Sequence, residues 1–156
     1  MSEKPKILLR ESYLAMIENS PGTKMFRSVF AETENGKKED ILNDGKLSCA
    51  YFVSSLLLPF RLIERVHVTV PGTMKDLTAS GWGLIDVVRE GAVVLWRSRE
   101  YPDGEAHAHV GFALRAGEAV STDYAKKEVV RHPMTELNGR REVESLWWHP
   151  ALDNAG

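Results

Sequence analysis

Apolar and polar positions divide the chain into a helical first part and a strand-rich second part, with the change near Gly91. In residues 8–18 the apolar side chains recur at spacings of three and four, which is the pattern of an amphipathic helix, and the Asn-Ser-Pro-Gly sequence that follows is a stop signal. Residues 48–63 are almost continuously apolar and predict a longer, buried helix. Ser48 is placed to cap the first turn of this helix.

The segments around these two helices are less regular. Residues 69–83 predict a turn at Pro71 followed by a short helix that ends at Gly81. Residues 25–31 fit either a strand or a helix. Residues 32–45 are polar and rich in Asp, Asn and Gly, so we expect a loop there that leads to the buried helix.

The second part of the chain alternates short β-prone runs with turns that contain Gly, Asp or Pro. Consecutive short strands with tight connections predict an antiparallel meander. The expected strands are residues 92–97, 108–115, 119–123, 127–131 and, as a further one, 141–148. Helices followed by such a sheet predict an α+β fold, in which N-terminal helices pack on a C-terminal antiparallel β-sheet and residues 1–156 form a single domain.

Composition and charge narrow the classes of partner. Apolar residues make up 43% of the chain and charged residues 27%, as in ordinary soluble proteins. Lys and Arg number 20 against 22 Asp and Glu, so no basic excess exists for nucleic acid or anionic lipid, and we expect neither as a partner. The charged start indicates no signal peptide, and the longest apolar stretch, residues 50–60, is too short to span a bilayer. The expectation is a soluble, cytoplasmic chain.

Cys49 is the only cysteine, so it cannot form an internal disulfide. If Ser48 caps the helix, Cys49 lies in its first turn, where free backbone N–H groups and the helix dipole favour a thiolate. A lone cysteine in an apolar helix also fits an inert core residue. The position therefore makes Cys49 a candidate nucleophile that needs a partner base.

His109 is the candidate base. Alternation along its predicted strand places His107, His109 and Gly111 on one face, with apolar residues on the other face to cover the helices. An imidazole on the first face can take the Cys49 proton and later protonate a leaving amine, and Gly111 leaves space beside it. A histidine on a strand also fits a purely structural role.

A base imidazole needs a third polar group that fixes its tautomer. The next predicted strand offers Ser121 and Asp123 on one face, and either can orient His109. Asp123 is the stronger acceptor, but an Asp that precedes a turn also fits a capping role at the strand end.

The order of these motifs resembles that of the NlpC-type cell-wall peptidases and their relatives, the CHAP amidases. The family has a cysteine at the start of an apolar helix, as at residues 48–53, then a strand like Gly-Ala-Val-Val-Leu-Trp at 91–96, then His-Val-Gly, found here at 109–111. Two positions depart from the family pattern, because Ser48 and Ala92 stand where it has Asp. The resemblance covers roughly residues 44–132.

The resemblance implies a papain-like fold and a thiol hydrolase that cleaves an amide bond in peptidoglycan stem peptides or a related peptide. It also implies a catalytic Cys49 and His109 and a third residue on the following strand. Ser121 lies at about that place, and Asp123 or His132 takes the role if the register differs. The implied chemistry uses no cofactor and no metal ion.

Two other functions stay open. His107 and His109 on one strand face, with Asp103, Asp123 or His132 nearby, offer nitrogen and oxygen ligands for a metal ion. The chain also fits a module that binds a peptide or a glycan on the same scaffold without catalysis.

Overall fold

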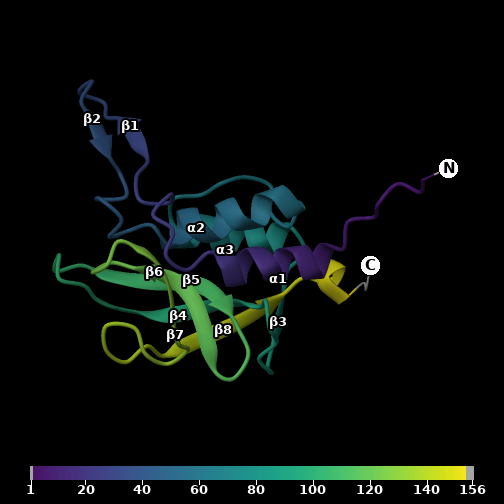
Figure 1. The fold of residues 1–156 in the computed structure, drawn as a ribbon. Coiled ribbons are helices and arrows are strands. Elements are labelled where there is room, and N and C mark those ends of the chain that lie inside the picture. Colours follow the sequence, from purple (N-terminus) through teal and green to yellow (C-terminus); the bar gives the residue numbers. More distant parts are fainter. Residues whose placement is uncertain (1, 154–156) are drawn as a thin grey trace.

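The computed structural model describes residues 2–153 and places three α-helices along one side of a curved antiparallel sheet (Figure 1). The helices are α1 (Leu9–Asn19), α2 (Cys49–Leu57) and α3 (Val70–Ala79), with short 3-10 turns η1 (Leu58–Phe60) and η2 (Pro150–Asp153). The strands are β1 (Phe30–Glu32), β2 (Lys38–Asp40), β3 (Gly83–Ile85), β4 (Val93–Glu100), β5 (Ala106–Ala113), β6 (Glu118–Asp123), β7 (Glu128–Pro133) and β8 (Val143–Trp148). The predicted α+β class is confirmed.

The main sheet has six strands in the order β3-β8-β4-β5-β6-β7, and every neighbouring pair is antiparallel. Strands β4 to β7 form the predicted meander. Strand β8 instead returns across the sheet and pairs between β3 and β4. This return closes the side of the sheet that the meander leaves open, and local sequence patterns do not specify it.

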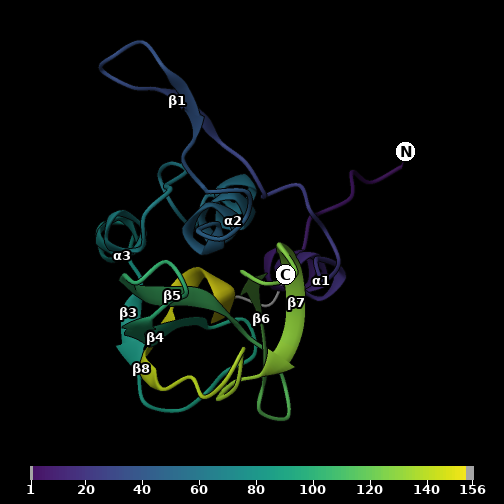
Figure 2. The ribbon, with the colours of Figure 1, turned by 90° about the vertical axis from the view of Figure 1, so that its left-hand side faces the viewer.

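Two small features were not predicted. Strand β3 pairs with β8, and β1 and β2 form a separate hairpin that projects from the body beside α2 (Figure 2). Each of these strands has three residues and leaves its side chains largely exposed, so it carries no apolar alternation. The expected loop at residues 32–45 is therefore partly a hairpin.

The predicted buried helix is present but shorter. Helix α2 ends at Leu57, because Pro59 lies in the 3-10 turn that follows and Arg61 then adopts a left-handed conformation with φ 57°. The short third helix also begins earlier than expected. Pro71 lies within its first turn, and Thr69 Oγ1 accepts a hydrogen bond from the backbone N–H of Gly72 at 3.1 Å.

The hydrophobic core lies between the helices and the sheet. Phe112 of β5 stands at its centre, with its ring edge-on to Phe52 of α2 at 5.6 Å and to Tyr13 of α1 at 6.0 Å. All three side chains are fully buried. The apolar face of β5 thus fixes α2, and with it Cys49, against the sheet.

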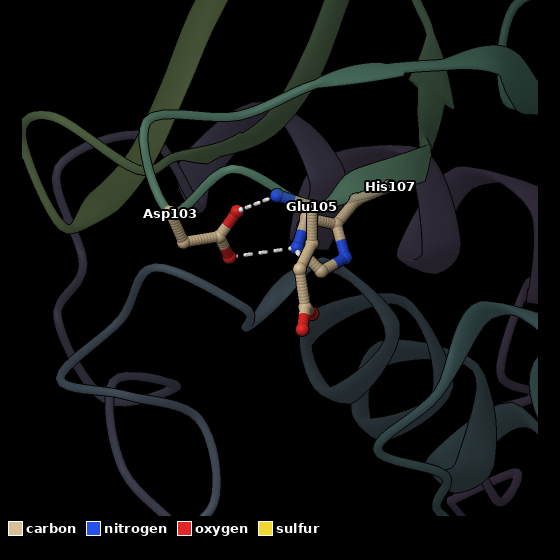
Figure 3. Close-up of side chains that lie close together, drawn as sticks. All are labelled: Asp103, Glu105 and His107. Carbon is tan, nitrogen blue, oxygen red and sulfur yellow. Dashed lines mark hydrogen bonds and ion pairs between the residues drawn. The ribbon is translucent and has the colours of Figure 1, made fainter.

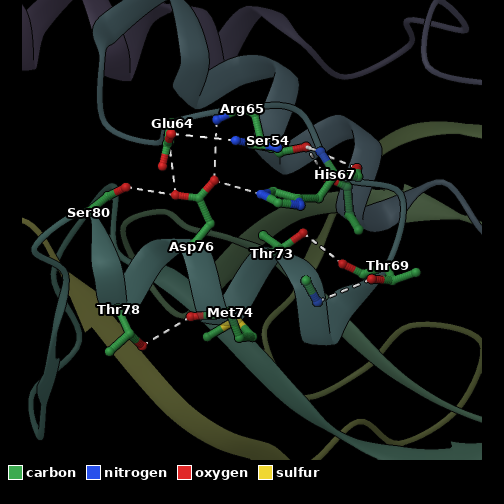
Figure 4. A network of polar contacts seen from close by, with 12 residues as sticks. Ser54, Glu64, Arg65, His67, Thr69, Thr73, Met74, Asp76, Thr78 and Ser80 are labelled. Carbon is green, nitrogen blue, oxygen red and sulfur yellow. Dashed lines mark hydrogen bonds and ion pairs between the residues drawn. The ribbon is translucent and has the colours of Figure 1, made fainter.

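A polar network joins α2 to α3 (Figure 4). The Asp76 carboxylate accepts hydrogen bonds from the backbone N–H groups of Glu64 and Arg65 at 3.2 Å, from the Ser80 hydroxyl at 2.7 Å and from His67 Nε2 at 2.6 Å. This network holds the chain that leads from α2 into α3.

Within residues 2–153 no helix is long and apolar enough to cross a membrane.

Candidate active site

Cys49 is the first residue of α2, as the sequence predicts, but the cap is different. Ser48 makes no side-chain cap to the helix; its hydroxyl donates to the carbonyl of Gly45 at 3.2 Å. The prediction that Ser48 caps the helix is wrong. With φ of -100° and ψ of 0°, Ser48 also lacks the extended backbone that is typical of a capping residue.

The expected lowering of the Cys49 pKa is also wrong. Burial raises the pKa of the Cys49 thiol, and this effect outweighs the backbone N–H groups of Val110 and Ala50 and the charge of Arg141, which act in the opposite direction. The residue nevertheless keeps intermediate exposure. Cys49 therefore rests as a neutral thiol that is open to the cleft, and it needs a base to become a nucleophile.

His109 lies on β5 opposite Trp96 of β4, and its ring lies 5.2 Å from the indole. Gly111 leaves no open space beside His109, because neighbouring atoms fill the room that a side chain would take. A Cβ atom at position 111 would lie 2.6 Å from the Val120 carbonyl oxygen and 2.7 Å from Ser121 Cβ. Only glycine lets β6 and Trp96 approach this closely, so the alternation that places His109 and Gly111 on one face is confirmed.

Ser121 joins His109 to a second buried histidine, His132. The Ser121 hydroxyl lies 2.9 Å from His109 Nε2 and 2.6 Å from His132 Nε2. His132 Nδ1 lies 2.7 Å from the carbonyl oxygen of Pro133 and 3.1 Å from that of Glu136. Carbonyls only accept, so His132 Nδ1 carries a proton, and in the neutral ring Nε2 is an acceptor.

The direction of these hydrogen bonds fixes the tautomer of His109. Ser121 donates its proton to His132 and must therefore accept from His109 Nε2–H, which leaves Nδ1 of a neutral His109 as the basic nitrogen. Nδ1 has no hydrogen-bond partner among the described residues. It is not sealed from solvent either, because Arg141 Nε is the only fully buried side-chain nitrogen or oxygen without a partner in residues 2–153.

Both histidines are held in the neutral form. Burial lowers the pKa of His109 well below its ordinary value, and the positive charges of Arg141 and Arg99 lower it further. Burial also lowers the pKa of His132, although its hydrogen bonds to backbone carbonyls act in the opposite direction. At pH 7 both rings are therefore neutral, as the assigned tautomers of His109 and His132 require.

Asp123 does not contact His109. Its carboxylate accepts hydrogen bonds from the backbone N–H of Ala125 at 2.8 Å and of Lys126 at 3.3 Å and from the Asn138 side chain at 2.8 Å. This is the turn-capping role that the sequence offers as the alternative. Of the candidates for a third residue, the structure brings Ser121 and His132 to His109 and leaves Asp123 at the turn.

Cys49 and His109 line one cleft of about 620 Å³. It lies between the start of α2, the segment that enters α3, and the ends of β4, β5 and β6. No hydrogen bond joins the Cys49 sulfur to His109 among the residues described, and in the absence of substrate such pairs are often long. The lining of the cleft also includes Arg99, Tyr101 and Arg141, which no sequence pattern indicated. No motif marks them, because the return of β8 brings Arg141 to the site.

The proposed metal site is only partly assembled (Figure 3). His107 Nε2 lies 2.8 Å from the Asp103 carboxylate and 4.0 Å from that of Glu105. In residues 2–153 this is the one group of three or more His, Cys, Asp or Glu side chains with a spacing that suits an ion. His109 is not part of this group. The expected pairing of the two histidines as ligands is therefore not found.

Comparison of the sequence with protein-family models gives no match, and comparison with curated proteins gives none.

Proposed function

We propose that the chain is a papain-like thiol hydrolase that cleaves an amide bond, with Cys49 as nucleophile and His109 as base. Ser121 and His132 are positioning residues. The substrate is a peptide, of the kind found in peptidoglycan stem peptides or a related molecule. The observation that carries the proposal is the Ser121 hydrogen-bond chain, which leaves Nδ1 of His109 as the basic nitrogen, together with the cleft that both His109 and the only cysteine line.

The proposed reaction starts from a neutral Cys49 thiol and a neutral His109 ring. The Cys49 proton passes to His109 Nδ1 while the sulfur forms a bond to the amide carbonyl carbon. Backbone N–H groups of the first turn of α2, which have no acceptor within the helix, stabilise the oxyanion. His109 then gives the proton to the leaving nitrogen as the C–N bond breaks. Water attacks the thioester, loses a proton to His109, and releases the acid with the thiol restored.

The burial of the site supports this proposal over a surface thiol with a chance neighbour. His109 is 3% exposed and Ser121 is fully buried. Burying three polar side chains in a chain of hydrogen bonds costs free energy unless each group is satisfied. His109 Nδ1 has no hydrogen-bond partner among the described residues, and His109 lines the same cleft as Cys49.

The test is hydrolysis of peptidoglycan stem peptides and related short peptides, followed by mass spectrometry of the products. Cys49→Ala should abolish cleavage, and a covalent adduct with the mass of the acyl fragment should form on wild type but not on the variant. Ser55→Ala is the matched control, because Ser55 is a half-buried residue on the same helix that does not line the cleft. Cleavage by Cys49→Ala at the wild-type rate would contradict the proposal.

A second candidate is a peptide-binding or glycan-binding module that does not cleave its ligand. The neutral thiol and the lack of a bond between Cys49 and His109 favour it. It predicts that wild type and Cys49→Ala bind the same peptide with equal affinity and that the peptide is recovered intact. Isothermal titration followed by mass spectrometry of the peptide separates the two functions.

A further inference from the structure

The guanidinium of Arg141 is the least satisfied polar group in the described chain. The residue is 1% exposed, yet it lines the cleft beside Cys49. Nη1 donates to the Arg97 carbonyl at 3.2 Å, Nη2 donates to the Tyr101 hydroxyl, and Nε is buried without a partner. Both acceptors are neutral, so the positive charge of Arg141 meets no negative one.

Arg99 is a second arginine of the cleft without a negatively charged partner. Arg99 also lines the cleft, and its guanidinium donates only to two backbone carbonyls, at 2.6 and 3.1 Å. Neither Arg99 nor Arg141 takes part in any ion pair within residues 2–153. Glu142 follows Arg141 in the sequence but pairs with Arg97 at 3.3 Å. The cleft thus has two arginines without a paired carboxylate, and the acid next to Arg141 in the sequence pairs with another residue.

The described lining of the cleft has positively charged side chains and no carboxylate. Lys46, Arg99 and Arg141 line it, whereas none of its described lining residues is Asp or Glu. Asp103 is not among these lining residues, and its carboxylate is bonded to His107 at 2.8 Å. Of these cations Arg141 is buried, Arg99 is half-buried and Lys46 is exposed. Burying a charge such as that of Arg141 without a counter-charge is costly, and such a cost is tolerated where a ligand supplies the missing charge.

We propose that the cleft binds a carboxylate of the substrate, held by Arg141 and Arg99, next to the amide that Cys49 attacks. The substrate class is therefore a peptide with a free carboxylate beside the scissile bond, from a chain end or an acidic side chain. This inference rests on the proposed function. Guanidinium groups recognise carboxylates through paired N–H donors, and the unpartnered Nε of Arg141 is such a donor.

Matched alkylating reagents test this site without requiring hydrolysis. The first pair is iodoacetate and iodoacetamide, and the second, with a longer arm, is iodoacetylglycine and iodoacetylglycinamide. In each reaction the Cys49 sulfur forms a C–S bond as iodide leaves, and the thiol proton is lost to His109 or water. Because the chain has one cysteine, intact mass reports the reaction at that residue alone.

The quantity to compare is the rate ratio of carboxylate to amide reagent, divided by the same ratio for free N-acetylcysteinamide. We expect a value of about ten or more for at least one pair in wild type, with a rate that saturates with reagent concentration. Arg141→Gln and Arg99→Gln should each reduce the ratio towards one. Their effect on the thiol itself cancels, because both reagents in a pair report it.

Arg97→Gln is the matched control. Arg97 lies on β4 two residues before Arg99, is exposed, and does not line the cleft. Its loss removes the same net charge and should leave the ratio unchanged. If Arg141→Gln does not fold, the wild-type ratio and Arg99→Gln still decide the question.

A ratio near one for both pairs in wild type overturns the carboxylate site and leaves the thiol hydrolase standing. An equal fall of the ratio in Arg97→Gln shows general charge attraction and also overturns it. If no reagent of either kind modifies Cys49 between pH 7 and 9, the thiol is not accessible as a nucleophile, and both proposals fail.

Discussion

Two histidine sites, a half-buried one at His67 and a buried one at His109, differ in the partner that the imidazole meets. His67 Nε2 faces the Asp76 carboxylate at 2.6 Å, and Asp76 also fixes backbone N–H groups between α2 and α3. His109 Nε2 faces the neutral Ser121 hydroxyl at 2.9 Å and lies near arginine charges. A carboxylate thus holds the first imidazole, whereas burial and nearby positive charges lower the pKa of the second.

This difference separates a structural histidine from a candidate base. A carboxylate that also accepts from backbone N–H groups ties the His67 imidazole into a structural network. A hydroxyl partner with nearby cations leaves the ring neutral, with a lone pair available to accept a proton. We therefore expect substitutions at His67 and Asp76 to change stability, and substitutions at His109 to change rate.

The largest expected effect comes from His109→Gln. Glutamine can still donate to Ser121 but cannot accept the Cys49 proton, so peptide hydrolysis should fall by about 10²- to 10⁴-fold. The midpoint of thermal unfolding should move little. The measurements are kcat/KM on a cleaved peptide and a thermal unfolding curve for the same preparation.

The matched variant for this comparison is His67→Gln. This change disturbs the 2.6 Å contact between His67 Nε2 and Asp76, so we expect a lower unfolding midpoint with kcat/KM near that of wild type. If the two variants lose equal activity at equal folded fraction, the division into a structural and a catalytic histidine is wrong.

The second prediction concerns Asp76→Ala. This change leaves the donors of Glu64, Arg65, His67 and Ser80 without their acceptor, and we expect a loss of about 2–4 kcal/mol in the free energy of unfolding. Urea unfolding at pH 7 measures this. Asp86→Ala is a suitable control, because no hydrogen bond or ion pair is recorded for the Asp86 side chain, and it should change the free energy by less than about 0.5 kcal/mol.

The third prediction is the pH dependence of the same network. Burial alone raises the pKa of Asp76, but hydrogen bonds from His67, Ser80 and two backbone N–H groups outweigh burial and lower it. A lowered pKa in the folded state means that the stabilisation is complete above the unfolded pKa, about 3.9, and is lost as the pH falls through the folded value. The difference in unfolding free energy between wild type and Asp76→Asn should therefore shrink below about pH 4. A constant difference from pH 7 to pH 3 would contradict the lowered pKa.

Local sequence patterns predicted much of the fold. The spacing of apolar residues gave α1, α2 and the meander from β4 to β7, because these elements each bury one face against the core. Strand β8 was expected as a strand, but its place between β3 and β4 was not. Pairing between distant strands depends on how the whole sheet closes, and no local pattern contains that information.

Local sequence patterns also predicted only part of the candidate site. Alternation placed His109 and Gly111 on one face, and the next strand offered Ser121, which lies at hydrogen-bond distance from His109. The direction of the Cys49 pKa was wrong, because it depends on how deeply the sulfur is buried, and sequence does not show this. Arg141 was missed, because its contact with the cleft follows from the return of β8.

The smallest expected effect tests which polar residue orients His109. Ser121→Ala removes the bond that fixes the tautomer, and we expect about a tenfold loss in kcat, since His109 can still act as a base in one of its two tautomers. Asp123→Ala removes the acceptor of the turn at Ala125 and should cost about 1 kcal/mol of stability with kcat unchanged. The pH profile of kcat/KM should shift for Ser121→Ala alone, because only that change alters the surroundings of the His109 ring. A shift in Asp123→Ala with none in Ser121→Ala would make Asp123 the residue that orients the base, against the contacts of the structure.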